Sequence, residues 1–110
     1  MSNNFWKKLE KPILALGPMA DVTDCAFREI IARYGKPSVM WTEFVSADGL
    51  YYTREIQKIP DTENPLMKDL LYSEAERPIV AQLFSATSSM MSYGARLCKE
   101  LGFDGVDINM

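Results

Sequence analysis

The sequence predicts an α/β fold in which parallel strands alternate with helices. Short apolar runs of strand length alternate along the chain with segments whose apolar residues recur at helical spacing. Glycine and proline separate the two kinds of segment, as they do at turns. Strands that are joined by helices favour right-handed crossovers and therefore a parallel sheet. The four predicted strands are residues 13–16, 38–44, 78–84 and 104–109.

The first strand and helix are the clearest pair. Ile13–Leu16 is a short apolar run closed by a Gly-Pro pair, which is typical of a buried strand. Thr23 or Asp24 can cap the helix that follows. Gly35 is expected to end this helix, because Lys36-Pro37 prevents its continuation. The apolar face of the helix is predicted to comprise Ala26, Phe27, Ile30, Ile31 and Tyr34.

The middle of the chain, residues 45–77, follows neither period well. A helix is expected within residues 47–59, although their apolar residues match a helical spacing only in part. The Pro, Asp and Asn content of residues 60–65 predicts a loop. Residues 66–72 are expected to form either a short helix or an irregular insert.

Regular structure resumes in the last third of the chain. Thr87 or Ser88 is expected to cap a helix that Gly102 ends. Gly94 lies beside the apolar face of this helix and would let it approach a sheet closely, at some cost in helix propensity. That face is predicted to comprise Met91, Ala95, Cys98 and Leu101.

The spacing of the strands predicts half of a (β/α)8 barrel. Strands start near positions 13, 38, 79 and 104, so they recur about every 25 residues apart from one longer connection. A complete barrel of this type takes about 250 residues. Only Met110 follows the last predicted strand, with no turn or polar tail. We therefore expect residues 1–110 to be the first four strands of a truncated barrel domain.

Composition excludes several functional classes. The 110 residues carry 12 basic and 15 acidic side chains, and this net charge of -3 is not the basic excess of a free-standing nucleic-acid binder. Two cysteines and no histidine make a disulfide scaffold or a zinc site unexpected. No apolar run approaches the roughly 20 residues that span a membrane. We expect a soluble, cytoplasmic protein without a bound metal.

Five further residues are expected to have structural roles. Cys25 and Cys98 both lie on predicted helices and are expected to be buried structural thiols. Phe5 and Trp6 are expected to form an N-terminal plug, because nothing around them forms a site. Asp107 is expected to be paired within the sheet.

Polar residues lie where the predicted strands end. In parallel α/β sheets, ligands collect at the carboxyl ends of the strands, because the loops there are free to vary. A glycine and a proline follow the first strand, and their backbone can approach a flat ligand closely. The other three strands carry polar side chains where packing alone would favour Val or Leu, and these must find partners. They are Glu43, Gln82, Asp107 and Asn109.

Four segments of the chain resemble, in the same order and at the same spacing, four motifs of the dihydrouridine synthases. The first is Gly-Pro-Met-Ala-Asp-Val-Thr-Asp at residues 17–24, followed by Phe27-Arg28. The others are Thr-Glu-Phe-Val-Ser-Ala at 42–47, Arg-Pro-Ile-Val-Ala-Gln-Leu-Phe at 77–84 and Gly-Val-Asp-Ile-Asn-Met at 105–110. The resemblance therefore covers nearly the whole chain.

The resemblance implies an FMN enzyme that acts on tRNA. In this family a nicotinamide cofactor, NADH or NADPH, reduces FMN, which delivers a hydride to C6 of a tRNA uridine while a cysteine protonates C5. Asn109 would contact the flipped-out uracil or the flavin, and Glu43 would be a polar support beside the substrate at the barrel mouth. The flavin contacts implied by the resemblance are Pro18, Met19, Ala20 and Gln82.

The resemblance also implies that the chain lacks its catalytic residue. The family motif continues beyond the position of Met110 with Gly-Cys-Pro, whose cysteine is the proton donor. The phosphate-binding loops and the helical tRNA-binding domain of the family would also lie outside this chain. The isolated chain is therefore expected to be inactive, and its uncovered strand edges are expected to make it self-associate.

Two positions depart from the family pattern, and two other functions remain open. Asp21 and Ser85 stand where the family usually has glycine; the first could crowd the flavin, and the second would stiffen a turn.

One alternative function is another FMN-dependent barrel oxidoreductase, although such enzymes lack the combined Thr-Glu-Phe and Asp-Ile-Asn-Met patterns. The other is a non-catalytic half-barrel module.

Overall fold

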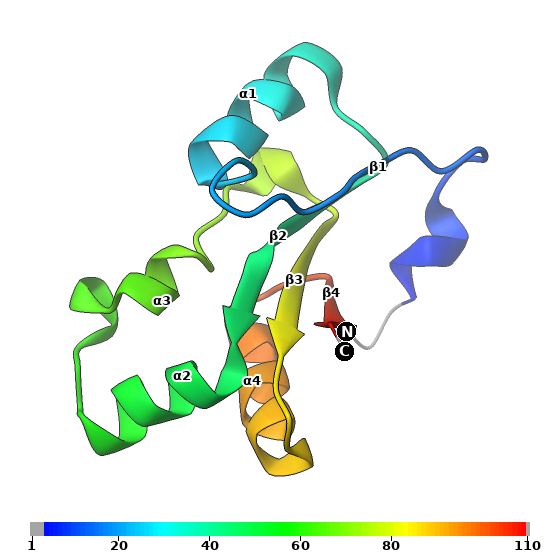
Figure 1. Cartoon of the computed structure of the whole chain (residues 1–110). Helices are drawn as coiled ribbons and strands as arrows, with labels where there is room; N and C mark the ends of the chain where they lie inside the picture. Colours follow the sequence, from blue (N-terminus) through cyan, green and yellow to red (C-terminus); the bar gives the residue numbers. More distant parts are fainter. Residues whose placement is uncertain (1–3, 110) are drawn as a thin grey trace.

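A computed structural model describes residues 4–109 and shows one parallel sheet flanked by helices (Figure 1). The strands follow one another across the sheet in the order β1-β2-β3-β4, and every neighbouring pair is parallel. The predicted α/β fold is therefore confirmed, and it is consistent with part of a (β/α)8 barrel. Met110, the last residue of the fourth motif, lies outside the described residues. The strands are β1 (Ala15–Leu16), β2 (Val39–Ser46), β3 (Ile79–Phe84) and β4 (Gly105–Asn109).

Helices connect the strands along the part of the chain that the structure describes. α1 (Cys25–Gly35) joins β1 to β2, and α4 (Ser88–Glu100) joins β3 to β4. The connection between β2 and β3 contains the helix expected within residues 47–59, followed by shorter pieces. Its elements are α2 (Ala47–Tyr51), the π-helical η2 (Tyr52–Ile56), η3 (Asp61–Glu63), α3 (Pro65–Lys68) and η4 (Glu74–Glu76). Within residues 4–109, the helices are all too short or too polar to span a membrane.

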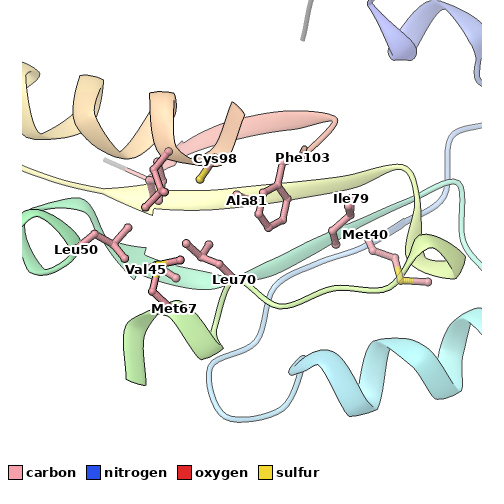
Figure 2. Packing of buried hydrophobic residues seen from close by; sticks show 11 residues of the cluster. Met40, Val45, Leu50, Met67, Leu70, Ile79, Ala81, Cys98 and Phe103 are labelled. Carbon is pink, nitrogen blue, oxygen red and sulfur yellow. The ribbon is translucent and has the colours of Figure 1, made fainter. Parts of the chain in front are cut away.

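The face of the sheet that is turned toward the helices carries the hydrophobic core (Figure 2). Side chains alternate between the two faces along a strand, and residues paired in register share a face. The register pairs Met40 with Ile79 and Val45 with Leu83, so these four side chains lie together. The segments outside the sheet bury Leu50, Met67, Leu70, Leu97, Cys98 and Phe103 against them.

A β-bulge in β2 changes which of its residues face away from the helices. Between Trp41 and Phe44, β2 advances by three residues while β3 advances by two. The buried Thr42 lies in this bulge, and its hydroxyl accepts a hydrogen bond from the backbone N–H of Gln82 at 3.1 Å. The bulge therefore places Trp41 and Phe44 on the same face of the sheet, away from the helices. We call this the inner face.

α4 approaches the sheet closely at Gly94, as expected. A Cβ atom there would lie only 3.0 Å from Cδ1 of Leu83 and 3.1 Å from Cβ of Ala47. The predicted apolar face is confirmed in part: Cys98 belongs to the core and Met91 and Leu101 pack against it, but the face also includes the buried Gly94 and Leu97. The small glycine, rather than the largest apolar side chains, sets the line of closest approach. The other residues predicted for this face are half-buried: Met91, Ala95 and Leu101.

α1 packs with a different face from the predicted one. Ile30 and Tyr34, both assigned to its apolar face, are 58% and 79% exposed. The buried residue of α1 is Arg28, which pairs with the buried Glu76 of η4. An apolar pattern leaves charged residues out, so it cannot show that a buried ionic partner determines the orientation of the helix.

The predicted helix ends are confirmed in part. Asp24 is the N-cap of α1 and accepts a hydrogen bond from the Phe27 N–H at 2.8 Å. Gly102 follows α4 with a φ of 90°, a left-handed conformation that glycine adopts without strain. Thr87 is the N-cap of α4, but its own side chain makes no capping bond. Oγ of Ser85 accepts a hydrogen bond from the Thr87 N–H at 3.1 Å, a bond within the turn that Ser85 was expected to stiffen.

β1 is shorter and more exposed than the strand predicted at residues 13–16. Only Ala15 and Leu16 pair with β2, and Leu14 is 64% exposed. The prediction of a buried strand was therefore wrong for this chain. A short apolar run predicts burial only where both sides of the strand are covered, and β1 is an edge of the sheet that residues 4–109 form.

The N-terminal residues pack where the strands begin. In η1 (Phe5–Lys8), Phe5 stacks on Trp6 with ring centroids 4.6 Å apart, and Trp6 lies 6.0 Å from Trp41 of β2. A Cβ atom on Gly105, the first residue of β4, would lie 3.2 Å from the Phe5 ring. This arrangement agrees with the expected N-terminal plug and places it at the amino ends of the strands.

Replacement of Gly94 by leucine should destabilise the fold. Leucine gains about 0.8 kcal/mol of helix propensity over glycine, but overpacking against Leu83 and Ala47 typically costs about 1–3 kcal/mol. Gly35→Leu is the matched control, because Gly35 also lies in a helix and has open space around it. Urea unfolding should give a lower free energy of unfolding for Gly94→Leu than for Gly35→Leu. Equal values would show that α4 is not constrained by close approach.

Candidate functional site

The carboxyl ends of β2, β3 and β4 form an open pocket on the inner face of the sheet. Its volume is about 490 Å³, and it is lined by Phe44, Phe84, Ser85, Ala86 and Asn109. Phe44 and Phe84 meet edge to face with their ring centroids 5.5 Å apart, and both rings remain exposed. Two exposed aromatic rings beside an amide side chain suit a flat ligand with a polar edge.

Gln82 lies on the same inner face, opposite Phe44 in the register of the strands. Its side chain is largely buried, and its Nε2 donates a hydrogen bond to Oδ2 of Asp107, its register neighbour on β4, at 3.0 Å. The expectation that Asp107 is paired within the sheet is confirmed. Because Asp107 holds the amide nitrogen, the amide oxygen of Gln82 is the atom that can accept a hydrogen bond from a ligand.

Glu43 and Trp41 carry buried polar atoms that no residue within 4–109 pairs with. These atoms are Oε1 of Glu43 and Nε1 of Trp41, both in or next to the bulge of β2. A buried polar atom normally has a partner, because leaving it unpaired costs roughly 1–3 kcal/mol. Glu43 therefore offers a hydrogen-bond acceptor, and Trp41 a donor, that the described fold does not use.

The structure does not bring the loop after β1 into this pocket. Pro18, Met19 and Ala20 follow β1, which ends opposite Met40, whereas β2 continues to Ser46. None of the three lines the pocket that the described residues form. Strand lengths depend on pairing across the sheet, so the sequence could not show that β1 ends at a different level from its neighbours.

The backbone of this loop explains one departure from the family pattern. Asp21 has a φ of 61°, in the left-handed region that glycine adopts freely and aspartate tolerates. The N–H groups of Val22 and Thr23 both donate to the carbonyl of Met19 at 3.0 Å and close a tight turn. The turn therefore requires a left-handed residue at position 21, and aspartate is among the few side chains that meet this requirement.

One group of three possible metal ligands occurs within residues 4–109, and its donors are already engaged. The group consists of Cys25, Glu29 and Glu76. Glu76 pairs with Arg28, and the Cys25 thiol donates to Glu76 at 3.5 Å. Burial, together with the negative charge of Glu76, raises the pKa of Cys25 to about 11, so its thiol is protonated at neutral pH and is a poor metal ligand.

The two cysteines differ in burial. Cys98 is fully buried, as expected, and burial raises its pKa to about 12. Cys25 is only half-buried, which corrects the expectation that both thiols are buried. It lies at the first turn of α1, where the side chain borders the solvent as well as Glu76.

Sequence reasoning missed the two aromatic rings of the pocket. An apolar residue in a strand predicts core packing, so residue type alone does not mark Phe44 or Phe84 as a site residue. One signal was present, because Gln82 and Phe84 are two positions apart and must share a face. Phe44 joins them only through the β-bulge, which the sequence does not reveal.

Comparison with known proteins agrees with the motifs. A model of the dihydrouridine synthase (Dus) family matches residues 13–110. Over all 110 residues the chain is 36% identical to the probable tRNA-dihydrouridine synthase 2 of Bacillus subtilis (strain 168) and covers 32% of that protein. It is 31% identical over the same length to the probable tRNA-dihydrouridine synthase of Staphylococcus aureus (strain COL) and covers 31% of it. The chain thus spans about a third of the length of these relatives.

Cys25 should react slowly with alkylating reagents. The thiolate is the nucleophile, and raising the pKa from 9.0 to about 11 lowers the thiolate fraction at pH 8 by about 100-fold. Labelling with iodoacetamide, followed by mass spectrometry, should therefore show a rate that rises about tenfold per pH unit between pH 8 and 10. Cys98 should stay unlabelled while the chain is folded. Labelling of Cys25 at pH 8 as fast as a free thiol would contradict this assignment.

Proposed function

Since the chain belongs to the dihydrouridine synthase family, we propose that it forms part of an enzyme that reduces uridine to 5,6-dihydrouridine in tRNA. The observation that carries this proposal is the family match over residues 13–110. The relatives' names also favour this activity over that of another FMN-dependent barrel oxidoreductase. Because the chain spans about a third of their length, the activity is proposed for the whole protein.

The residues of the pocket fit FMN as the cofactor. An isoalloxazine ring is flat and apolar on its faces and carries hydrogen-bonding groups along its edge. Phe44 and Phe84 supply exposed rings for such a ligand, and Gln82 supplies an acceptor for an N–H group at its edge. When bound and reduced by NAD(P)H, FMN supplies the hydride that uridine receives.

Gln82 is proposed to orient the flavin ring. The bond from its Nε2 to Asp107 fixes the amide plane before any ligand binds. An acceptor whose direction is already set loses less conformational entropy on binding. We propose that the loop after β1 contacts the flavin outside this pocket, through Pro18, Met19 and Ala20.

Asn109 and Glu43 are proposed to act on the substrate side. Asn109 lines the pocket and is exposed, so its amide can pair with the donors and acceptors of a flipped-out uracil. Glu43 has a buried carboxylate oxygen that accepts no hydrogen bond from residues 4–109, so this oxygen can accept one from a ligand. The proton donor is proposed to be a cysteine that follows Met110 in the whole protein.

Residues 1–110 are proposed to be a partial FMN-binding barrel domain that supplies its first four strands. Twelve basic against fifteen acidic side chains give no basic excess for binding RNA, so we infer that most of the tRNA contact comes from the rest of the protein. The proposed setting is the cytoplasm, and no metal is assigned to the reaction.

A second candidate function is a non-catalytic half-barrel module that assembles with another polypeptide. The outer edges of β1 and β4 have no strand partner within residues 4–109. Leu14 beside the first edge and Ile108 on β4 are both exposed. Unpaired strand edges with apolar neighbours promote association, and this observation favours the second function only for the isolated chain.

Gln82→Ala should weaken FMN binding by about tenfold to a hundredfold, because one or two hydrogen bonds to the ring edge contribute roughly 1–3 kcal/mol. The measurement is a fluorescence titration of FMN in a chimera in which this chain replaces the matching segment of the Bacillus subtilis relative. Gln57→Ala is the control, since Gln57 is exposed after η2 and outside the pocket. The wild-type chimera should purify yellow. An unchanged affinity for Gln82→Ala would show that Gln82 only supports the sheet.

The 110-residue chain by itself should bind FMN weakly, form no dihydrouridine and self-associate. A positioned proton donor typically contributes about 10²–10⁴-fold to a rate, and none is assigned within the chain. Light scattering should show a mass above that of one chain, and Leu14→Lys should lower it by placing a charge at the β1 edge. Leu71→Lys is the matched control, because Leu71 is similarly exposed, at 59% against 64% for Leu14, but lies outside the sheet. Dihydrouridine formed at the rate of a whole synthase would overturn this assignment.

A further inference from the structure

Three buried polar side chains meet where the loop after β1, helix α1 and the segment before β3 come together. Arg28 is 1% exposed, and Glu76 and Thr23 are fully buried. None of them lines the pocket or belongs to the proposed flavin or substrate contacts. Buried polar groups are costly unless fully paired, so their bonding shows what they hold in place.

The guanidinium of Arg28 binds three acceptors from three segments of the chain. Its Nε donates to Oε1 of Glu76 at 2.5 Å, and its Nη1 donates to the carbonyl of Thr23 at 2.7 Å. Its Nη2 donates to the carbonyl of Leu71, also at 2.7 Å. A planar fork with several donors can satisfy all three acceptors, which the single ammonium group of lysine does less well.

Thr23 carries this connection into the loop. Its hydroxyl accepts a hydrogen bond from the N–H of Met19 at 2.9 Å and donates to the Met19 carbonyl at 3.2 Å. The left-handed Asp21 lies inside the turn that these bonds close. The conformation of Met19 therefore depends on Thr23, and the position of Thr23 depends on Arg28.

Glu76 carries the connection toward β3. Its Oε2 accepts hydrogen bonds from the N–H of Ser73 at 2.7 Å and from the Ser73 hydroxyl at 3.1 Å, which closes the capping box of η4. β3 begins three residues later at Ile79 and contains Gln82. One buried pair therefore links the loop that contains Met19 to the strand that contains Gln82.

We propose that Arg28, with Glu76 and Thr23, is a positioning residue for the flavin, because it holds the Pro18–Ala20 segment in a fixed place relative to β3. This proposal rests on the proposed flavin function of that segment. The reason for an arginine is geometric: one side chain forms hydrogen bonds to the Thr23 carbonyl, to the Leu71 carbonyl and to Glu76 at the end of η4.

Two substitutions test whether the network holds the loop. Thr23→Val removes the hydroxyl that bonds Met19 but keeps the ion pair, and Arg28→Lys keeps the charge but removes the fork. In the 110-residue chain, hydrogen–deuterium exchange of the backbone amides at positions 22 and 23 should accelerate about tenfold or more in both variants. Exchange within α4 should not change. Thr53→Val is the matched control, because the Thr53 hydroxyl bonds the Gly49 carbonyl, outside this loop.

The same variants in the chimera test the consequence for the flavin. Thr23→Val and Arg28→Lys should weaken FMN binding about tenfold and shift the visible absorption band of bound FMN, whereas Thr53→Val should change neither. A loss of stability alone would not move that band.

Unchanged exchange at positions 22 and 23 in both variants would overturn the proposal. Faster exchange with unchanged flavin affinity and spectrum would overturn it as well. A wild-type chimera that binds no FMN would instead refute the proposed flavin function, and the exchange measurements on the 110-residue chain would still decide whether Arg28 and Thr23 hold the loop.

Discussion

The ion pair between Arg28 and Glu76 is the interaction on which the arrangement of the chain depends. It joins residues 48 positions apart and is almost completely withdrawn from water. Removing one partner of such a pair typically costs about 3–5 kcal/mol, because the remaining charge stays buried and unpaired. α1 therefore turns its charged residue inward and leaves Ile30 and Tyr34 exposed. The same pair ties the turn after β1 to the segment that leads into β3.

The sheet has its hydrophobic core on one face and the candidate site on the other. Side chains that point toward α2, α3 and α4 form the core, which includes Ile79, Ala81 and Leu83 of β3 (Figure 2). The alternate residues of β3 point to the inner face, where Gln82 meets Asp107 and Phe84 meets Phe44. Because side chains alternate along a strand, one short segment can supply both a packed core and an open site.

The candidate site was predictable where its residues contradict simple packing. Gln82, Asn109 and Glu43 are polar in segments that otherwise predict buried strands, and the structure places Gln82 and Asn109 at or beside one pocket. Phe44 and Phe84 give no such contradiction, so their role emerged only from the register of the strands. The segment Pro18–Ala20 was expected to contact the same flavin as Gln82, but β1 pairs only with the start of β2 and ends before the pocket.

The sequence by itself determined the order of strands and helices, an N-cap at Thr23 or Asp24, of which the structure selects Asp24, and the stop at Gly102. These features depend on the spacing and backbone preferences of residues that are close together in the chain, so the sequence alone indicates them. Only the tertiary structure decided the bulge between Trp41 and Phe44, the face on which α1 packs and the length of β1. Each depends on a partner that is far away in the sequence. A local pattern cannot show whether a buried charge pairs with an opposite charge or whether a strand pairs with a neighbouring strand.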